Sequence, residues 1–373
     1  MNILYLCTYY HRAMIFRDSM NMLESLGHET RAFNAVAEGT KVDDKYLPIM
    51  DDKVVHEECF RKIDRYVYFR KQNKIYRRLK EKVDISRFDI IHSHTLFNGG
   101  WVAYRLKKEA SIPYVVTVRN TDVNEFLKFP FFVPVARKIA DEASAVMFLS
   151  EPYEKQFLEK VYGRQPAEKQ KEILKKCHII PNGLESFWLD NAGESKDISS
   201  DTVELICVGK IDHNKNMKSI VKAMDILKKR GVSTHLTVIG QVVDEDIYEM
   251  LQENADIDII SYQTKENLIG YYRRSDIFVM PSFRETFGRV YAEAMTQGVP
   301  VVYTRNQGFD GFFKEGEVGY SVDANDPETV ADAVCRIMEN YSRISADCIE
   351  KSRMFNWPDI VLKLEDMYKD DVK

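Results

Sequence analysis

Short apolar runs recur along the chain, and segments whose apolar residues have helical spacing separate most of them. The runs that we expect to form strands are 2–7, 88–92, 114–118, 145–149 and 177–183 in the first half, and 203–208, 235–239, 257–261, 276–280 and 299–303 in the second half. Strands that alternate with helices favour a parallel sheet with helices on both faces. Because the pattern starts again near residue 203, the sequence predicts an α/β fold with two Rossmann-like, doubly wound domains.

The segment 280–302, M-P-S-F-R-E-T-F-G-R-V-Y-A-E-A-M-T-Q-G-V-P-V-V, is the most informative stretch of the sequence. It follows a predicted strand and leads into another. From Thr286 the apolar residues recur at helical spacing until Gly298, which ends the predicted helix. Glu285 is therefore expected in the loop at the N-terminus of this helix, and Glu293 two turns further along it.

The residues around this helix N-terminus suit a ligand that carries both negative charge and hydroxyl groups. Unpaired N–H groups and a partial positive charge favour an anion such as a nucleotide diphosphate, and Gly288 leaves room for a ligand close to the backbone. Glu285 and Glu293, about 12 Å apart along a helix, can accept hydrogen bonds from sugar hydroxyls. Alternatively, Glu285 is simply favoured by the helix dipole and Glu293 is a solvated helix residue. The flanking residues favour the ligand.

Those flanks, P-S-x-x-E-x-F-G followed by E-A-M and G-V-P-V-V, resemble the signature of family 4 retaining glycosyltransferases (glycosyl transferases group 1, E-x7-E). The resemblance implies the GT-B fold, in which two Rossmann-like, doubly wound parallel-sheet domains face each other across a cleft. It also implies transfer of a hexosyl unit, with its anomeric configuration kept, from a nucleotide-sugar to a saccharide or lipid-linked saccharide in surface polysaccharide biosynthesis. Glu285 would contact the donor sugar and Glu293 the ribose, and Thr286, Phe287 and Gly288 would lie at the donor.

The loop after strand 203–208 supplies positive charge for the same ligand. It begins with Gly209 and Lys210, and Lys210 and Lys215 match the two basic residues with which the family grips the donor diphosphate, although the first is more often arginine. Two lysines make a metal ion dispensable for stabilising the leaving nucleotide, and no D-x-D follows a predicted strand. We therefore expect no metal and no cofactor besides the nucleotide-sugar substrate. Tyr262 lies where relatives hold the base, and a UDP-sugar is favoured over a GDP-sugar.

The strand ends of the first half carry the other candidates. His92 and His94 share one face by strand alternation, and His94 lies nearer the carboxyl end, where α/β folds place ligands. The family has H-x-H here, so the resemblance implies a catalytic role for His94; a hydrogen-bonded structural role is the alternative. Arg119 either holds an anionic acceptor or pairs with Asp122. The first strand–helix loop reads T-Y-Y-H and lacks G-x-G-x-x-G, which disfavours a dehydrogenase.

A strongly basic and aromatic segment covers residues 60–87, and we expect it to form a long amphipathic helix. Its cations are Arg61, Lys62, Arg65, Arg70, Lys71, Lys74, Arg77, Arg78, Lys80, Lys82 and Arg87. Such a helix suits docking on an anionic membrane surface. The alternatives are a solvated face on a normally packed helix and a site for an anionic acceptor. No nucleic-acid motif accompanies the charge, so we expect no nucleic-acid partner.

Composition limits where such a protein works. The 6 cysteines are scattered without a C-x-x-C pair, which disfavours a metal site or a disulfide framework and favours a reducing cytosol. No apolar run reaches the roughly 18 residues of a transmembrane helix, and the opening run is too short for the apolar region of a signal peptide. We expect a cytoplasmic protein, attached at most peripherally to the inner face of the cell membrane.

Charge divides the chain as the strand pattern does. Residues 1–185 carry a net charge of +6 and residues 186–373 one of −11, which suggests an anionic partner for the first half. We expect an acceptor-binding domain over 1–185, a donor-binding domain over 203–354 and a final helix over 355–373 that crosses back to the first domain. The Ser-, Asp- and Gly-containing segment 191–201 is expected as a flexible connection. Two rival functions remain: a nucleotide-sugar epimerase of similar fold and a non-catalytic sugar-nucleotide-binding protein.

Overall fold

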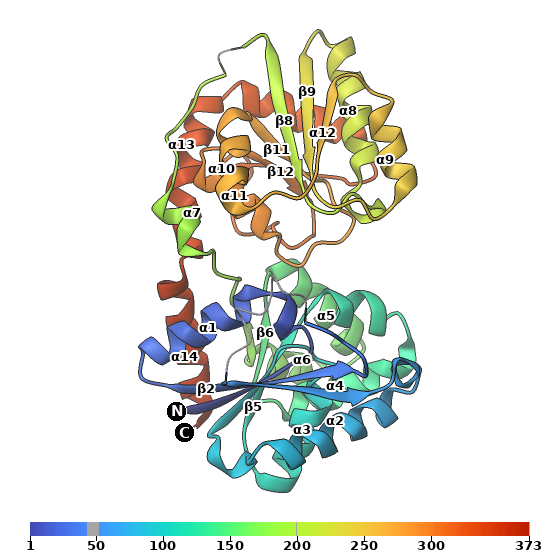
Figure 1. The fold of residues 1–373 in the computed structure, drawn as a ribbon, viewed down its shortest axis with the longest axis vertical. Coiled ribbons are helices and arrows are strands. Elements are labelled where there is room, and N and C mark those ends of the chain that lie inside the picture. The colour runs from blue at the N-terminus through green and yellow to red at the C-terminus, as the bar shows by residue number, and fades with distance from the viewer. Residues whose placement is uncertain (43–51, 199, 373) are drawn as a thin grey trace. The chain divides into compact units, whose positions relative to one another are not determined.

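The structure, a computed structural model, describes residues 1–42, 52–198 and 200–372 and divides them into two compact units (Figure 1). Unit 1 comprises Met1–Gly183 and the segment from Trp357 onward, and unit 2 comprises Leu184–Asn356. Each unit contains a parallel sheet between helices. The predicted fold class of two Rossmann-like, doubly wound α/β domains is therefore confirmed.

Unit 1 has a 7-stranded parallel sheet in the order β3-β2-β1-β4-β5-β6-β7. Its strands are β1 (Asn2–Cys7), β2 (Glu29–Ala37), β3 (Val54–Phe60), β4 (Ile90–Ser93), β5 (Tyr114–Val118), β6 (Ala145–Phe148) and β7 (Cys177–Ile179). The central strands consist largely of buried Ile, Leu, Val and Tyr residues because helices cover both of their faces.

The helices of unit 1 form two layers (Figure 1). They are α1 (Met14–Ser25), α2 (Tyr68–Lys82), α3 (Gly100–Ala110), α4 (Val133–Glu142), α5 (Glu151–Tyr162), α6 (Ala167–Leu174) and α14 (Trp357–Val372). Helix α1 packs against α14, whereas α2, α3, α4 and α5 pack side by side in chain order. The final helix therefore belongs to unit 1, although unit 2 separates it in sequence from the rest of that unit.

Unit 2 has a 6-stranded parallel sheet in the order β10-β9-β8-β11-β12-β13. Its strands are β8 (Thr202–Val208), β9 (Ser233–Ile239), β10 (Ile257–Ile260), β11 (Ile277–Val279), β12 (Val301–Thr304) and β13 (Gly319–Val322). Its helices are α7 (Ser186–Asp190), α8 (Met217–Lys229), α9 (Glu245–Gln252), α10 (Lys265–Arg274), α11 (Arg289–Thr296), α12 (Pro327–Met338) and α13 (Tyr341–Ser352). Helices α8 and α12 pack together, as do α11 and α13.

The strand order of unit 2 reverses at β8. The chain runs from β8 outward to β9 and β10 and then returns to β11 on the other side of β8, with which it pairs. The loops that leave the carboxyl ends of β8 and β11 consequently turn to opposite faces of the sheet. Such a reversal is where open parallel sheets bind ligands, and it brings the loop at residues 209–216 next to the loop at residues 280–288.

The predicted strands all occur, although strand 177–183 is shortened to β7 (Cys177–Ile179) and others differ slightly at their ends, but three strands were not predicted. Strands β3 and β13 lie at the sheet edges, where β3 carries polar residues and β13 is only 4 residues long. Strand β2 is interrupted in sequence by Arg31 and Asn34, which conceal its buried character. Polar residues in β2 and β3, and the glycine and serine of the buried β13, thus weaken the apolar signal on which the prediction depends.

Three local predictions differ from the structure. The first helix begins at Met14 rather than near Arg17. The basic segment 60–87 is not one helix, because the last residue of β3, a 3₁₀ turn at Lys62–Tyr66 and then α2 divide it. Residues 191–198 of the expected flexible connection are attached to unit 2, since the Lys196 ammonium donates to three backbone carbonyls of that unit at 2.5–3.3 Å.

The contact between Gly183 and Trp357 joins α14 to the rest of unit 1. A Cβ at Gly183 would lie 2.4 Å from the Trp357 ring, so only glycine lets the ring pack on this backbone. We expect Gly183→Ala to lower the free energy of unfolding by about 1–3 kcal/mol, as overpacking does. Urea unfolding measures it. The control is Gly270→Ala in α10, where the nearest atom is 3.7 Å away and belongs to a flexible Arg274 side chain. An unchanged midpoint in Gly183→Ala would contradict the packing.

Candidate functional site

An ion pair joins the two loops at the strand-order reversal of unit 2. The Lys215 ammonium lies 2.7 Å from the Glu285 carboxylate, and both side chains are mostly buried, with exposures of 16% and 20%. Residue 215 follows β8 and residue 285 follows β11, so the pairing of these two strands brings the charges together. Two of the residues predicted to bind a donor therefore lie side by side.

The loop that carries Lys215 is held by local hydrogen bonds. The Asp212 carboxylate accepts a hydrogen bond from the backbone N–H of Lys215 at 2.9 Å. Asn216 has a left-handed backbone, with φ of 55°, and its buried amide donates to the carbonyls of Pro281 and Ala324. Asparagine tolerates this conformation better than most residues. These bonds fix the position of Lys215 before any ligand binds.

The backbone of Glu285 is held from the next loop along the sheet. Its N–H donates to the Gln307 side-chain oxygen at 3.1 Å, and its carbonyl accepts from the Gly308 N–H at 2.7 Å. A Cβ at Gly308 would lie 2.1 Å from the carbonyl carbon of Thr286, so the two backbones touch directly. Gln307 and Gly308 were not predicted from the sequence. Their one signal was a short polar N-Q-G run after a predicted strand.

Gly209 and Lys210 occupy the end of β8. The Gly209 carbonyl would lie only 1.7 Å from a Cβ placed on Gly240, so two glycines allow the ends of β8 and β9 to approach closely. Lys210 is exposed, and within the described ranges it has no hydrogen-bond or ion-pair partner. Its ammonium is available to a ligand, whereas that of Lys215 already has a carboxylate partner.

The predicted helix at Thr286 begins later than expected. Gly288 has a left-handed backbone, with φ of 78°, and α11 starts only at Arg289. The Phe287 ring is 1% exposed and packs among Phe309, Phe312 and Phe355, so its side chain is part of the core. Only the backbone of Phe287 can therefore meet a ligand. Thr286 has a similar backbone role, because its N–H donates to the Glu285 carboxylate at 3.1 Å.

Glu293 lies on α11 and is partly buried. Burial raises the pKa of Glu293 to about 7, an effect that the nearby Arg289 opposes and Glu185 reinforces. Its carboxyl has no hydrogen-bond partner in the described part of the chain. Tyr262 follows β10, near the edge of the same sheet, and is 73% exposed. The structure thus places Glu285, Glu293 and Lys215 in unit 2 but does not test their predicted roles.

The two histidines of β4 and its end differ in their surroundings. His92 is fully hydrogen-bonded, with Nδ1 2.6 Å from the Tyr368 hydroxyl and Nε2 2.7 Å from the Thr117 hydroxyl. His94 stacks on His92 at 4.1 Å and is 5% exposed, yet neither of its ring nitrogens has a partner in the described residues. Burial, together with the neighbouring His92 and Arg119, lowers the pKa of His94, so its ring is neutral. A neutral imidazole has one donor and one acceptor nitrogen, and both nitrogens of His94 are buried.

Arg119 and Asp122 do not form the side-chain pair that was one alternative. The Asp122 carboxylate accepts three backbone N–H bonds, from Leu96, Phe97 and Arg119. The Arg119 guanidinium instead donates to the His94 carbonyl at 2.8 Å. Arg119 thereby fixes the backbone at His94, and Asp122 holds the backbone of the loop that follows His94.

Most cations of the basic segment 60–87 have partners within unit 1. Arg70 and Lys74 both pair with the buried Asp64, at 3.0 and 2.5 Å. Arg78 and Lys82 pair with Glu57 at 2.8 and 3.1 Å, and Lys80 pairs with Glu109. These pairs neutralise much of the charge that the sequence displays. In the described ranges, no three His, Cys, Asp or Glu side chains gather as a metal ion requires.

Comparisons with known families match both halves of the chain. The model of "Glycosyl transferases group 1" matches residues 190–355, and that of "Glycosyl transferase 4-like domain" matches residues 15–169. The first match includes Lys210, Lys215, Glu285 and Glu293. The second includes His94. The two matches fall on the two units of the structure.

Curated relatives and solved structures agree with this result. The D-inositol 3-phosphate glycosyltransferase of Corynebacterium glutamicum is 30% identical over 178 residues, 44% of this chain and 43% of the relative. The capsular polysaccharide biosynthesis glycosyltransferase CapM of Staphylococcus aureus is 29% identical over 43% of this chain and 44% of the relative. The matched region thus spans less than half of either relative.

Two solved structures cover nearly the whole chain. Sucrose-phosphate synthase from Thermosynechococcus elongatus has a TM-score of 0.77 at 19% identity and covers 99% of both chains. Anabaena Alr3699/HepE in complex with UDP-glucose has a TM-score of 0.71 at 15% identity, covering 99% of this chain and 100% of the other. At such identities, the likeness shows the shared fold.

The raised pKa of Glu293 has a consequence for stability. The folded chain binds the proton of this carboxyl up to about pH 7, whereas the unfolded chain loses it near pH 4.5. The stabilisation is present below pH 4.5 and is lost as the pH rises through 7. We expect Glu293→Gln to raise the free energy of unfolding at pH 8 by about 1–3 kcal/mol, and to change it little at pH 4.5. Urea unfolding at both pH values measures this, with the exposed Glu249→Gln as control. Equal changes at both pH values would contradict the assignment.

Proposed function

The chain belongs to the glycosyl transferases group 1 and has the GT-B fold, and we propose that it is a retaining glycosyltransferase that moves a hexosyl unit from a nucleotide-sugar to a saccharide or lipid-linked saccharide acceptor. The observation that carries this proposal is the Lys215–Glu285 pair, with Lys210 nearby in sequence, at the strand-order reversal of unit 2. A diphosphate needs positive charge there, and a sugar needs acceptors for its hydroxyl hydrogens. The pair supplies both.

In this proposal, the lysines stabilise the leaving group. The C1–O bond of the donor breaks, and the nucleotide diphosphate departs with the electron pair while Lys210, Lys215 and the backbone N–H groups near Gly288 neutralise its charge. The acceptor hydroxyl attacks C1 from the same face and gives its proton to the departing phosphate oxygen. The anomeric configuration is therefore kept.

The remaining site residues position the donor. Glu285 contacts the sugar and stabilises the positive charge that develops on its ring, and Glu293 accepts hydrogen bonds from the ribose. His94 contributes its neutral ring to the reacting groups. The carboxylates of Glu285 and Glu293 lie on one short segment and are not an acid–base pair on two sides of a glycosidic bond.

The comparisons with known proteins support a class of donor and a pathway. The fold shared with a protein solved with UDP-glucose supports a UDP-sugar, and the likeness to CapM supports surface polysaccharide biosynthesis. Incubation of labelled UDP-sugars with saccharide acceptors, followed by NMR of the product, tests the transfer and its stereochemistry. An epimer formed without acceptor would favour an epimerase. Tight donor binding without transfer or hydrolysis would favour a non-catalytic binding protein.

Removal of the Glu285 carboxylate should affect turnover more than folding. We expect Glu285→Ala to reduce kcat at least ~100-fold, because a transition-state contact contributes about 3 kcal/mol. Glu293→Ala should act mainly on the KM for the donor. Steady-state kinetics with the donor varied separate the two effects, and circular dichroism checks folding. Near-normal turnover in Glu285→Ala would contradict the proposed contact between Glu285 and the donor sugar.

The lysines should recognise the diphosphate rather than the nucleoside. We expect Lys210→Ala and Lys215→Ala each to weaken UDP binding at least ~10-fold while uridine binding changes little, since charge-assisted hydrogen bonds contribute about 1.5–3 kcal/mol. Calorimetric titration measures both. Lys218→Ala is the matched control, because Lys218 is exposed and pairs with Asp246.

We expect the transfer activity to persist when a chelator removes divalent metal ions. Loss that magnesium or manganese restores would contradict metal-independent transfer.

An exposed apolar patch on unit 1 supports peripheral attachment to a membrane. Phe69 contacts Tyr68, which contacts Phe132, and the rings continue to Phe131 and Phe129 at centroid distances of 4.5–5.7 Å. Phe69, Phe129 and Phe131 are exposed, and the residues that precede α2 add the exposed apolar side chains of Ile63, Tyr66 and Val67. Lys62 and Lys128 are exposed in the same segments. No helix in the described residues is long and apolar enough to cross a bilayer. From its exposed rings and the exposed lysines beside them, we propose that this patch docks on an anionic lipid surface.

Aromatic rings at the surface, rather than the mostly paired cations, should drive this docking. We expect the double variant Phe129→Ser/Phe131→Ser to lose most sedimentation with vesicles of anionic lipid, because each exposed ring inserts apolar area among the headgroups. Leu174→Ser, which alters an apolar side chain of similar exposure on α6, should sediment like the wild type. If the wild type does not sediment even at low salt, the patch does not dock on lipid.

A further inference from the structure

A cavity of about 530 Å³ opens at the carboxyl edge of the sheet of unit 1. Residues that follow β1, end β2 and β3, and follow β4 and β5 line it, including Thr8, Ala37, Phe60, Asn98 and Thr121. Parallel sheets bind their ligands at this edge, and a cavity of this size holds a small organic molecule. Its position and volume therefore make it a candidate substrate site.

The cavity carries an excess of positive charge. Arg12, Arg65 and Lys71 line it, and the one carboxylate among its lining residues, Glu125, has a cation of its own in Lys128 at 3.3 Å. Neither arginine has an ion-pair partner in the part of the chain that the structure describes. A site with at least two uncompensated cations is complementary to a ligand with two negative charges.

Lys71 is the buried member of this group. It is 9% exposed, donates to the Asn98 side-chain oxygen at 2.6 Å and lies 4.7 Å from the centre of the Phe60 ring. No carboxylate of the described residues pairs with it. Burial, reinforced by the like charge of Arg65, lowers the pKa of Lys71 to about 8. A buried ammonium without a counter-ion is costly, and an anionic ligand would remove that cost.

His11 adds an unpartnered polar atom to the same cavity. It is 3% exposed, and the Asn34 amide nitrogen donates to its Nδ1 at 3.0 Å. Burial lowers the pKa of His11, so the neutral ring carries its proton on Nε2. Nε2 has no partner in the described residues. The lining of the cavity thus includes a buried hydrogen-bond donor without a partner in the described residues, in addition to its three cations.

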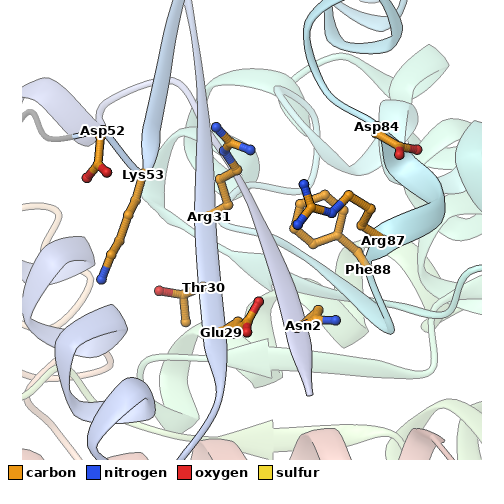
Figure 2. Close-up of a pocket in the computed structure, with 9 residues that line it drawn as sticks. All are labelled: Asn2, Glu29, Thr30, Arg31, Asp52, Lys53, Asp84, Arg87 and Phe88. Carbon is orange, nitrogen blue, oxygen red and sulfur yellow. The ribbon is translucent and has the colours of Figure 1, made fainter.

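A second cavity of unit 1 differs in its balance of charged residues (Figure 2). It measures about 250 Å³ and opens at the amino edge of the sheet, where its lining residues include the start of β1 and of β2. Its cations Arg31, Lys53 and Arg87 are matched by the carboxylates of Glu29, Asp52 and Asp84. This cavity is balanced in charge and lies at the edge where parallel sheets do not bind ligands. The charge excess of the cavity around Lys71 is therefore not shared by this second cavity.

We propose that the cavity around Lys71 binds a phosphate or diphosphate group of the acceptor, held by Lys71, Arg65 and Arg12. Arginine forks match phosphoryl oxygens in pairs, and a dianion fits the charge excess better than a single carboxylate. This inference rests on the proposed function, in which unit 1 receives the acceptor, and narrows the acceptor to a phosphorylated saccharide. The phosphoryl group can belong to a water-soluble sugar phosphate or to a lipid-linked diphosphate saccharide.

The test uses inorganic pyrophosphate as the probe, titrated into the full chain with the donor site saturated by UDP. We expect the wild type to bind one pyrophosphate under these conditions. Arg65→Gln and Lys71→Met should each weaken that binding by roughly tenfold or more, as loss of a charge-assisted hydrogen bond does. Arg77→Gln, an exposed cation on the same helix α2, is the matched control and should bind like the wild type. Arg65 is exposed, so its variant should fold normally even if Lys71→Met does not.

The outcomes separate this inference from the proposed function. Pyrophosphate binding that ignores both substitutions, or no binding at low salt while UDP binds, would overturn the phosphate site. Failure of UDP to bind would count against the proposed function. In that case pyrophosphate would be titrated without UDP, and a comparison of the wild type with Arg65→Gln would still test the phosphate site. Displacement of pyrophosphate by a hexose 1-phosphate indicates a soluble acceptor, and displacement by a short-chain prenyl diphosphate in detergent indicates a lipid-linked one. Displacement by neither would overturn the acceptor assignment.

Discussion

The contact between Lys215 and Glu285 depends on the order of the strands in unit 2. The two residues belong to loops that are 70 positions apart, and they meet only because β8 and β11 are neighbours in the sheet. Each loop is then held by its own bonds, through Asn216 on one side and Gly308 on the other. The charged groups are consequently fixed in place without a ligand. Preorganised charges of this kind stabilise a developing charge without further rearrangement.

The cations of unit 1 divide into two groups with different consequences. Arg70 and Lys74 enclose the buried carboxylate of Asp64, so their charges serve the packing of the turn before α2. Lys71, between them in sequence, points its ammonium to a neutral amide and an aromatic ring instead. Arg70 and Lys71 are adjacent on one helix and have different partners, because successive side chains point in different directions around the helix, whereas Arg70 and Lys74, four residues apart, share a face. Of these three cations, Lys71 is the one without a carboxylate partner in the described residues, and an anionic ligand would stabilise it.

The sequence predicted the fold where apolar runs are continuous and failed where polar residues interrupt them. Buried strands such as β1 and β5 have the predicted bounds, whereas β2 and the edge strands β3 and β13 were missed. At the candidate site, the motif led to Glu285 and Lys215, but Gln307 and Gly308 could not be found. Their importance lies in backbone contacts with a distant loop, and a local pattern carries no information about such contacts. The burial of the Phe287 ring could not be predicted for the same reason, since the ring packs into a core that only the folded chain defines.

The sequence by itself determined the alternation of strands and helices, the two-domain organisation and the carboxylates and lysines of the candidate site. These features follow from periodicity and from residue types at fixed spacing, which are properties of the chain alone. The tertiary structure decided which charges are compensated. Eleven cations between residues 60 and 87 look equivalent in sequence, yet Lys74 has a carboxylate partner and Lys71 has none within the described residues. Burial and pairing depend on residues brought together from distant positions, and for that reason the phosphate-binding cavity could be recognised only in the folded protein.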